Sequence, residues 1–248
     1  MYAFFLDIDG TLFDGERVSD EVISSIANAR NNGHMVFINT ARAFIAMPEQ
    51  IYDLPVNGFI NSFGLEIFAD GGFIHRSFMS KRKILRSARY AFKNNVSIYY
   101  EGQSSAGINR SREGSIDLKN MRDVRDALSK SKFCKISLHP KTAEEHKMRL
   151  SRGYSLLSGD IVRKGYCKSR GIQIVEKYYN IPHENTVAIG DTDPDIEMLG
   201  YAGIGVCMGN GTQNLKDSVK YITLSISEDG VAHAINRIIA GDLEQLKK

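Results

Sequence analysis

Two kinds of apolar pattern follow one another along most of the chain. Short continuous apolar runs, typical of buried strands, occur at residues 3–8, 35–39, 186–189 and 203–208. Between and after them, apolar residues recur every three or four positions, which is typical of amphipathic helices. Such helices are expected between Ser19 as N-cap and Gly33 as stop, and at residues 171–179, 195–199 and 230–239. Apolar strands joined by helices indicate right-handed crossovers in a parallel sheet.

The middle of the chain departs from this pattern. Residues 58–78 alternate apolar and polar around Asp70-Gly71-Gly72, which indicates a hairpin. Short elements of both kinds then follow. Helices are expected at residues 84–92, 123–129 and 143–150, strands at 96–100 and 134–138, and a loop rich in Gly and Ser at 104–115. These short elements indicate a small α+β insert.

Together the patterns predict an α/β fold, with a Rossmannoid, doubly wound parallel-sheet core and an inserted smaller α+β domain. The core would comprise residues 1–79 and 158–248, and the insert residues 80–157. A chain of 248 residues that is 42% hydrophobic and 25% charged has ordinary globular proportions. Composition therefore argues against a disordered chain, a coiled coil or a collagen-like repeat.

The two predicted domains differ in charge. Residues 81–153 contain 18 Lys and Arg against 7 Asp and Glu, whereas the rest of the chain contains 14 against 22. The basic insert should attract an anion through its long-range field, and acids of the remainder can hold a cation. Because the insert has neither zinc-finger spacing nor an RNP-like aromatic motif, no nucleic-acid partner is expected.

The sequence has no feature of a membrane or disulfide-bonded protein. No apolar run approaches the roughly 20 residues of a bilayer span. The N-terminus lacks a basic region and carries Asp7 and Asp9, so we expect no signal peptide. Cys134, Cys167 and Cys207 form no CxxC pair. We expect a cytoplasmic protein with reduced thiols, either a monomer or a small homo-oligomer.

Polar residues collect at the ends of three expected strands. They are Asp7 and Asp9 after the first strand, Thr40 and Arg42 after the second, and Asp191 and Asp195 after the third. In an open parallel sheet, ligands bind beyond the carboxyl ends of the strands, so these side chains can converge. Clustered carboxylates repel one another unless a cation neutralises them. Mg²⁺ prefers such oxygen ligands, and the sequence therefore predicts a magnesium site.

The segment Asp7-Ile8-Asp9-Gly10-Thr11 adds a reactive group to this expected site. Of two carboxylates at positions i and i+2, one can attack an electrophile while the other transfers a proton. Gly10 lets the backbone approach an anion closely. Thr40 offers a hydroxyl and an N–H to phosphate oxygens, and Lys168 supplies a positive charge that offsets charge developing in the transfer.

With these residues in view, the chain resembles the phosphatases of the haloacid dehalogenase superfamily, of the Cof-like type IIB branch. The resemblance covers nearly the whole chain. The motifs that carry it are DxDGT at residues 7–11, T-G-R at 40–42, K-G-x-x-K at 164–168, G-D-x-x-N-D at 190–195, M-G-N at 208–210 and E-D-G-V at 228–231. The first motif alone is moderately specific, but the ordered set is highly specific.

The resemblance implies a Mg²⁺-dependent phosphatase that hydrolyses small phosphate monoesters, with sugar phosphates or similar phosphorylated metabolites as substrates. Asp7 would be the nucleophile that forms an aspartyl-phosphate, and Asp9 the general acid and then the base. The basic insert would be a cap that closes over the site and selects the substrate. The implied catalytic residues are Asp7, Asp9, Thr40 and Lys168; the substrate-binding residues are Gly10, Thr40, Ala41, Arg42, Lys168 and Asn210; the metal-binding residues are Asp7, Asp9 (by its backbone carbonyl), Asp191 and Asp195.

The sequence departs from the family pattern at three places. Pro194 stands where the family has Asn; Asp193 before it is expected to cap the helix and can replace the lost amide near the metal. Ala41 replaces a glycine. Phe63-Gly64-Leu65 stands where relatives read N-G-A, so a contact at the rim of the site should differ. For Arg42, a substrate contact and an ion pair with an acid on the rim are equally compatible with the sequence.

Two other functions remain open. In a phosphomutase or phosphotransferase of the same superfamily, a sugar hydroxyl would replace water as the acceptor. In a phospho-accepting regulatory or binding protein, Asp7 would be phosphorylated without rapid hydrolysis. Asp9 and the expected cap argue against the latter, because a proton-transferring carboxylate two residues from the nucleophile promotes hydrolysis of the acyl-phosphate.

Overall fold

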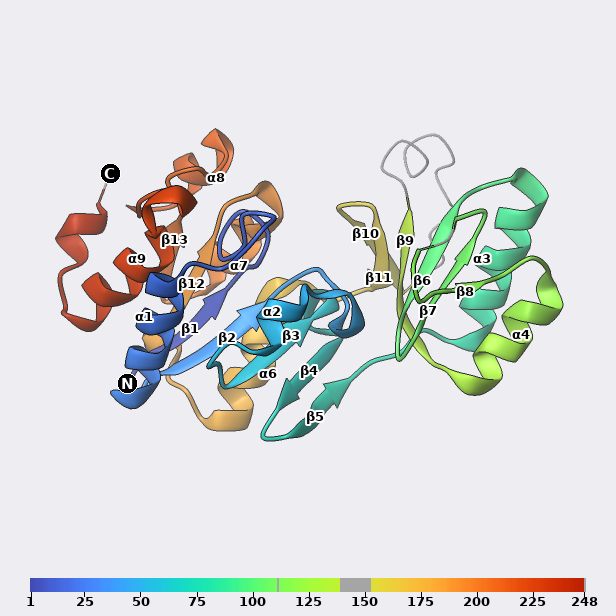
Figure 1. The fold of residues 1–248 in the computed structure, drawn as a ribbon, viewed down its shortest axis with the longest axis horizontal. Helices are drawn as coiled ribbons and strands as arrows, with labels where there is room; N and C mark the ends of the chain where they lie inside the picture. The colour runs from blue at the N-terminus through green and yellow to red at the C-terminus, as the bar shows by residue number, and fades with distance from the viewer. Residues whose placement is uncertain (111, 139–152, 248) are drawn as a thin grey trace. The chain divides into compact units, whose positions relative to one another are not determined.

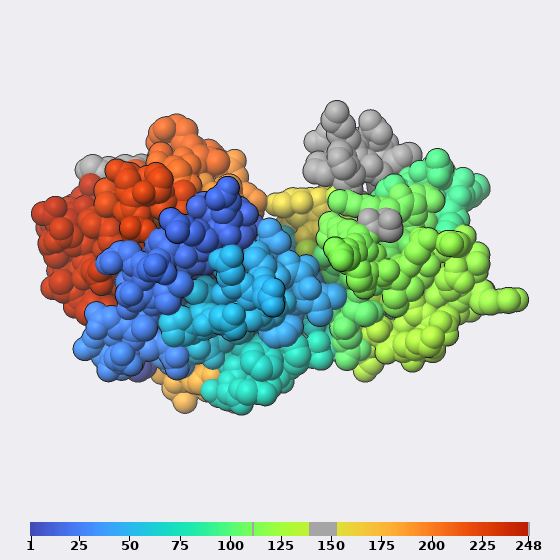
Figure 2. All heavy atoms as spheres, viewed as in Figure 1, coloured from blue at the N-terminus to red at the C-terminus, as the bar shows by residue number. Residues whose placement is uncertain are grey.

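The computed structural model of the protein describes residues 1–110, 112–138 and 153–247. These residues form two compact units. The first unit comprises Met1–Arg42, Met47–His75 and Cys167–Lys248, and the second comprises Ala43–Ala46 and Arg76–Tyr166. The two ends of the chain therefore build one unit together, and their blue-to-cyan and orange-to-red segments lie side by side in Figures 1 and 2.

The first unit contains an eight-stranded sheet in the order β14-β13-β12-β1-β2-β3-β4-β5. Its strands are β1 (Ala3–Leu6), β2 (Met35–Asn39), β3 (Gly58–Asn61), β4 (Glu66–Ala69), β5 (Gly72–Arg76), β12 (Thr186–Gly190), β13 (Ile204–Cys207) and β14 (Tyr221–Ile222). The strands from β14 to β3 run parallel, and β4 runs antiparallel to β3. The chain continues from β1 to β2 on one side and returns as β12 on the other. This is a doubly wound sheet with a topological switch point at β1, as predicted.

Helices pack on both faces of this sheet (Figure 1). Ala3 and Phe5 of β1 share a buried cluster with Ile172 and Met198 of two helices, and the alternate residues of β1 are buried on the opposite face. Ser19 caps the first helix, as predicted. The helices of this unit are α1 (Asp20–Asn31), α2 (Glu49–Tyr52), α6 (Lys168–Tyr179), α7 (Ile196–Tyr201), α8 (Gln213–Ser218) and α9 (Gly230–Ile239).

The second unit contains a six-stranded sheet in the order β10-β11-β9-β6-β7-β8 and two described helices. Its strands are β6 (Ile98–Gly102), β7 (Ser105–Ile108), β8 (Ile116–Asp117), β9 (Phe133–Leu138), β10 (Tyr154–Leu157) and β11 (Asp160–Arg163), and its helices are α3 (Lys81–Asn94) and α4 (Met121–Lys130). All described pairings in this sheet are antiparallel except that of β7 with β8.

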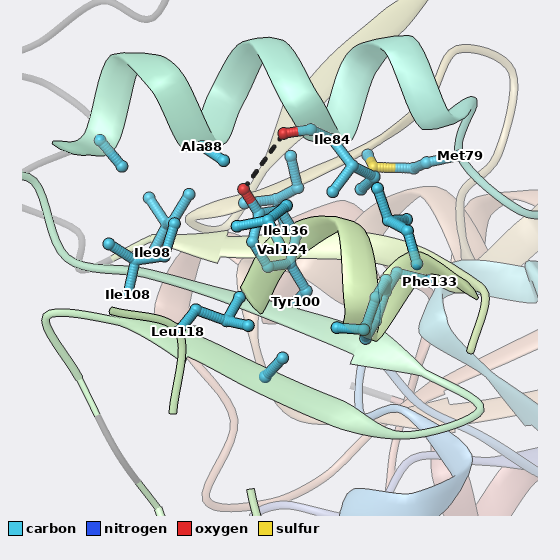
Figure 3. Close-up of a cluster of buried hydrophobic side chains, with 14 of the residues drawn as sticks. Met79, Ile84, Ala88, Ile98, Tyr100, Ile108, Leu118, Val124, Phe133 and Ile136 are labelled. Atoms are coloured by element: carbon cyan, nitrogen blue, oxygen red, sulfur yellow. Dashed lines mark hydrogen bonds between the residues drawn. The ribbon is translucent and has the colours of Figure 1, made fainter. Parts of the chain in front are cut away.

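A buried apolar cluster joins the helices of the second unit to its sheet (Figure 3). Ile84 and Ala88 of α3 pack in this cluster with Tyr100 of β6 and Ile136 of β9. The Tyr100 hydroxyl donates to the Ile84 carbonyl at 3.4 Å and lies 2.9 Å from the Ser87 hydroxyl. The apolar spacing of α3 therefore reflects a buried face, as its sequence predicts.

Two sequence expectations for the middle of the chain differ from the structure. The second unit extends to Tyr166 rather than to residue 157, because β10 and β11 continue the sheet beside β9. The expected loop at 104–115 contains β7, which pairs with β6. Gly107 lies within this strand although glycine is typical of loops. Glycine is needed at this position because a Cβ would lie 1.8 Å from the Arg110 carbonyl oxygen.

The expected helix at residues 143–150 lies outside the described residues. Within the described part of the chain, no helix is both long enough and apolar enough to cross a membrane.

Candidate active site

Three carboxylates meet at the switch point of the first sheet. Asp7 follows β1 and Asp191 follows β12, and these strands are paired, with Leu6 opposite Ile189. Asp195 belongs to the 3₁₀ turn η4 (Asp193–Asp195) that comes next. Each of the three acids offers an oxygen atom that lies within 4.8 Å of the others, and all three side chains are buried. The convergence expected from the strand ends is therefore present in the structure.

The Lys168 ammonium lies among these acids. Lys168 is the first residue of α6, and its side chain is 3% exposed. Its Nζ lies 2.8 Å from Asp7 Oδ1 and 2.6 Å from Asp195 Oδ1. One ammonium faces three carboxylates, so the cluster keeps an excess of negative charge when all of its groups are ionised.

The pKa values of the cluster reflect this excess. Burial raises the pKa of Asp7 to about 7, with Lys168 opposing the rise and Asp195 adding to it. Burial likewise raises the pKa of Asp191 to about 6, against the hydrogen bond from Thr11. Burial would lower the pKa of Lys168, but the two carboxylates beside it hold that pKa above its usual value. Asp7, Asp191 and Asp195 therefore fit a divalent cation, which prefers oxygen ligands and would supply the missing positive charge.

The Asp9 carboxylate forms an ion pair away from this cluster. Arg42 Nε donates to Asp9 Oδ2 at 2.8 Å, and Arg42 Nη2 donates to Oδ1 at 2.7 Å. Both side chains are partly exposed. Of the two roles open for Arg42 from the sequence, the structure shows the ion pair. Both oxygens of the Asp9 carboxylate accept a hydrogen bond in this arrangement.

The loop after β2 is held by a left-handed turn. Thr40 is 1% exposed, and its Oγ1 accepts the Arg42 N–H at 3.2 Å. Ser62 to Gly64 (the 3₁₀ turn η2) all have positive φ, which is uncommon for Phe63 at +60°. The Ser62 N–H donates to the Arg42 carbonyl at 2.8 Å, and the Phe63 N–H donates to the Thr40 carbonyl at 3.3 Å. Phe63, Gly64 and Leu65 are buried, so this segment supports the loop from the interior of the unit.

Gly10 and Asn210 lie together beside the acids. Gly10 has φ +79°, and a Cβ at this position would lie 2.1 Å from Asp191 Oδ2. Asn210 Nδ2 donates to the Gly10 carbonyl at 2.8 Å, while its Oδ1 accepts the Ile226 N–H at 2.8 Å. The Asn210 side chain thus holds the backbone of the loop that carries Asp9. Ala41 is half-buried between Thr40 and Arg42.

The segment around Pro194 keeps its turn without the family's Asn. The N-cap is Thr192, which forms a capping box with Asp195, so the expectation that Asp193 caps this turn is wrong by one residue. Asp193 Oδ1 instead accepts the Thr212 hydroxyl at 2.6 Å. Asp195 Oδ2 accepts the Asp191 N–H at 3.1 Å, which ties the two acids together.

Three further residues support the acids and Lys168 through contacts that the sequence does not predict. Thr11 Oγ1 donates to Asp191 Oδ1 at 3.0 Å. Glu197 Oε1 accepts hydrogen bonds at 3.0 Å from the side chains of both neighbours of Lys168. Asn39 Nδ2 donates to the Lys168 carbonyl at 3.0 Å. The sequence contains a hint of a functional role for two of them. Thr11 belongs to the DxDGT segment, and Asn39 is a polar residue that ends an apolar strand.

The family of the chain follows from comparison with known proteins. A family model for haloacid dehalogenase-like hydrolases matches residues 4–149 and 129–235. The chain belongs to this family. A relative of this haloacid dehalogenase-like hydrolase is 5-amino-6-(5-phospho-D-ribitylamino)uracil phosphatase YitU of Bacillus subtilis (strain 168), 29% identical over 260 residues that cover 93% of this chain and 95% of the relative. Phosphatase YwpJ of the same organism is 24% identical over 287 residues, which cover 96% of this chain and all of the relative.

Solved structures of haloacid dehalogenase-like enzymes share the fold. The subclass IIB sugar phosphatase BT4131 superposes with a TM-score of 0.79 at 23% identity, over 96% of this chain and 99% of that one. BT1666 from Bacteroides thetaiotaomicron gives a TM-score of 0.81 at 23% identity, over 96% and 94%. At these identities the likeness concerns the fold. The family and the fold expected from the sequence are thereby confirmed.

Proposed function

We propose that this hydrolase is a Mg²⁺-dependent phosphatase that cleaves small phosphate monoesters through an aspartyl-phosphate on Asp7. The observation that carries the proposal is the buried set of Asp7, Asp191, Asp195 and Lys168 at the carboxyl ends of β1 and β12. It combines a carboxylate nucleophile, a fixed ammonium and a place for a divalent cation. A phosphate dianion requires all three, because an attacking carboxylate otherwise repels it.

The chemistry proceeds in two displacements. A carboxylate oxygen of Asp7 attacks phosphorus and the ester P–O bond breaks, while Asp9 gives its proton to the leaving oxygen. The products of this step are the aspartyl-phosphate and an alcohol. Water then attacks the same phosphorus, Asp9 takes its proton, and the acyl-phosphate P–O bond breaks. Inorganic phosphate leaves and Asp7 is restored.

The remaining groups bind and orient the phosphoryl group. The Lys168 ammonium and the Thr40 hydroxyl would donate to its oxygens, where negative charge develops. Mg²⁺ held by Asp7, Asp191 and Asp195 would screen the repulsion between the Asp7 carboxylate and the phosphate. The Asp9–Arg42 pair has to open during the cycle, because both oxygens of the Asp9 carboxylate are hydrogen-bonded in this structure.

The proposed substrates are sugar phosphates or similarly polar phosphorylated metabolites. The name of the relative YitU supports this class, since it denotes a phosphatase of a phosphorylated ribityl compound. We propose the second unit as the cap that selects the substrate. We also propose a cytoplasmic location, supported by Cys134, Cys167 and Cys207, which form no disulfide with one another.

The deciding experiment measures phosphate release from a panel of phosphorylated metabolites, with Mg²⁺ and with EDTA. We compare the wild-type chain with Asp7→Asn and with Asp217→Asn, an exposed carboxylate on α8 that serves as the matched control. Release should require Mg²⁺, persist in Asp217→Asn and disappear in Asp7→Asn. Metal-independent release, or full activity of Asp7→Asn, would contradict the proposal.

A second variant separates hydrolysis from a phospho-accepting switch. Asp9→Asn removes the group that activates water against the acyl-phosphate. In a phosphatase this variant should lose turnover and accumulate phosphorylated Asp7, detectable by intact-mass spectrometry after acid quenching. In a switch protein the lifetime of the phosphorylated form should be the same with and without the substitution.

A further inference from the structure

Two buried asparagines end neighbouring strands of the first sheet. Asn39 is the last residue of β2 and Asn61 the last residue of β3, and both are 0% exposed. Asn39 Nδ2 donates to the Lys168 carbonyl at 3.0 Å, and Asn61 Nδ2 donates to the Arg42 carbonyl at 3.3 Å. A carbonyl oxygen only accepts hydrogen bonds, so each amide must turn its nitrogen toward that carbonyl.

The other half of each amide is left without a hydrogen bond. Asn39 Oδ1 and Asn61 Oδ1 are buried and have no hydrogen-bond partner among the described residues. Among the described residues, the other acceptors of the two Nδ2 atoms are weak sulfur acceptors, Met198 Sδ at 3.2 Å from Asn39 and Met47 Sδ at 3.1 Å from Asn61. An unpaired buried acceptor destabilises a fold, and an apolar residue of the same shape avoids that penalty.

An asparagine at such a buried strand end therefore lowers the stability of the fold compared with an apolar residue of the same shape. Residues of this kind are typical of functional sites, where a local penalty is retained because the position of a group matters. Both asparagines donate to the backbone of a residue whose side chain reaches the candidate active site. Lys168 contacts Asp7, and Arg42 contacts Asp9.

We propose that Asn39 and Asn61 are positioning residues that act on two different groups of the site, a proposal that rests on the phosphatase function above. Asn39 fixes the start of α6 and thereby the Lys168 ammonium beside the nucleophile. Asn61 acts together with the Ser62 N–H, which donates to the same Arg42 carbonyl at 2.8 Å. It fixes the backbone of Arg42 and thereby the resting position of the general acid Asp9, from which the carboxylate is released when the ion pair opens.

The two roles have different kinetic signatures. Lys168 binds the phosphoryl group of every substrate, so loss of Asn39 should slow alkyl and aryl phosphates alike. Asp9 protonates the leaving oxygen, which an alkyl phosphate requires and a p-nitrophenyl phosphate hardly needs. Loss of Asn61 should therefore slow alkyl phosphates selectively.

The test uses the near-isosteric variants Asn39→Leu and Asn61→Leu of the full chain, with Asn57→Leu as the control. Asn57 lies at the opposite end of β3, where its Oδ1 accepts the Val36 N–H at 2.8 Å. We measure kcat and KM for one alkyl phosphate and for p-nitrophenyl phosphate, together with the thermal midpoint. Asn39→Leu should lower kcat/KM for both substrates by roughly 10- to 100-fold, and Asn61→Leu for the alkyl phosphate alone.

The two leucine variants should lose activity without losing thermal stability. The thermal midpoints of Asn39→Leu and Asn61→Leu should equal or exceed that of the wild type, because each removes an unpaired acceptor. Asn57→Leu should lower the midpoint and leave the ratio of the two substrates unchanged. If either leucine variant retained wild-type kinetics, or lost activity only in proportion to its unfolded fraction, the positioning role would be overturned. If a leucine variant does not fold, the alanine variant of the same residue replaces it, and its kcat/KM values for the alkyl phosphate and p-nitrophenyl phosphate are compared in the same way.

A readout without turnover separates this proposal from the function on which it rests. The rate at which acetic anhydride acetylates Lys168 can be followed by peptide mass spectrometry. Acetylation should be faster in Asn39→Leu than in the wild type and unchanged in Asn61→Leu. Equal rates in all three proteins would refute the role of Asn39. A wild-type chain that releases no phosphate while showing this difference would refute the phosphatase function and retain the positioning role.

Discussion

At the scale of single residues, the site is governed by a shortage of positive charge. Lys168 is the cation that contacts Asp7 and Asp195, and it is as deeply buried as they are. Burying charges is costly unless each is paired, and removing one partner of a buried ion pair typically destabilises a fold by about 3–5 kcal/mol. Lys168 therefore stabilises the metal-free fold as well as serving the proposed chemistry.

This dependence makes the Lys168→Met variant informative. We expect its free energy of unfolding in EDTA to fall by about 3–5 kcal/mol, because Asp7 and Asp195 lose their shared partner. Mg²⁺ should then raise its thermal midpoint more than it raises that of the wild type, since the cation fills a larger charge deficit. Thermal unfolding at pH 8 with EDTA and with Mg²⁺ measures both effects. Equal Mg²⁺ shifts in the two proteins would contradict the idea that the cation and Lys168 offset the same negative charge.

Part of the site was accessible from the sequence and part was not. The meeting of Asp7, Asp191 and Asp195 follows from strand order alone, because parallel strands end at one edge of the sheet. The ion pair of Asp9 with Arg42 does not follow from strand order, since the rotamers of two exposed side chains decide it. The contact of Asn39 with Lys168 joins residues far apart in the chain and depends on how α6 packs.

At the scale of elements, α6 rests on the left-handed turn η2. A Cβ on Gly64 would lie 2.9 Å from the Gly171 nitrogen of α6, one helical turn after Lys168. The same turn donates backbone hydrogen bonds to the loop that carries Thr40. The turn therefore sets the spacing between that loop and the helix that carries Lys168.

Gly64→Ala should disturb this spacing, and Gly71→Ala is its matched control. Both glycines have positive φ, +82° and +76°, but nothing lies within 4 Å of a Cβ on Gly71. Gly71→Ala should lower the free energy of unfolding by about 1–2 kcal/mol, the usual penalty of the left-handed conformation. Gly64→Ala adds a backbone clash, so it should be less stable than Gly71→Ala and lose phosphate release per folded molecule. Urea unfolding and activity assays test the pair; equal behaviour of the two variants would contradict the spacing role.

A network of buried charged side chains connects three strands of the second sheet. Lys135 Nζ of β9 lies 3.1 Å from Glu101 Oε2 of β6 and 2.7 Å from Asp160 Oδ2 of β11. Ser137 and Arg112 also donate to the Glu101 carboxylate. Burial would raise the pKa of Glu101, but Lys135 and these other donors outweigh it and hold the pKa below its usual value.

The sign of this shift predicts a pH dependence. A lowered pKa means that ionised Glu101 stabilises the fold above the carboxyl's unfolded-state pKa and that this contribution is lost as the pH falls through the folded-state value. Glu101→Gln should therefore be less stable than the wild type at pH 7, by about 1–3 kcal/mol, and the difference should shrink on acidification below pH about 4. Urea unfolding of both proteins over a pH series measures it. A difference that stays constant with pH would exclude a role for the carboxylate charge.

The elements themselves were largely accessible from periodicity. Strands β1, β2, β9 and β12 and helices α1, α3 and α9 lie where the apolar pattern predicts them. Strand β7 was not found, because a Ser- and Gly-rich segment resembles a loop until its pairing with β6 and the close approach to Gly107 are known. The short helix α8 was missed as well, since six residues give too few periods for an amphipathic pattern.

At the scale of the whole molecule, charge is divided between the two units. Residues 81–153, all within the second unit's part of the chain, contain more Lys and Arg than Asp and Glu, whereas the rest of the chain contains more Asp and Glu. Helix α3 contains no acidic residue, and five of its six exposed residues are basic: Lys81, Arg82, Arg86, Arg89 and Lys93. A field from such a surface raises the encounter rate of anionic ligands and weakens with ionic strength.

This division predicts salt-dependent kinetics for phosphate dianions. Removing three charges from the second unit, in Arg82→Gln/Arg86→Gln/Arg89→Gln, should lower kcat/KM at low salt and flatten its decline between about 20 and 200 mM NaCl, because the Debye length shortens to roughly 10 Å near 0.1 M. The control, Arg30→Gln/Lys177→Gln/Lys220→Gln, removes the same net charge from exposed positions of the first unit. Since kcat does not depend on encounter, it should be equal in both variants. If kcat/KM declines equally with salt in the two triple variants, only the net charge of the protein matters. If kcat/KM declines more steeply in the control than in the α3 variant, the field that attracts the substrate comes from the second unit.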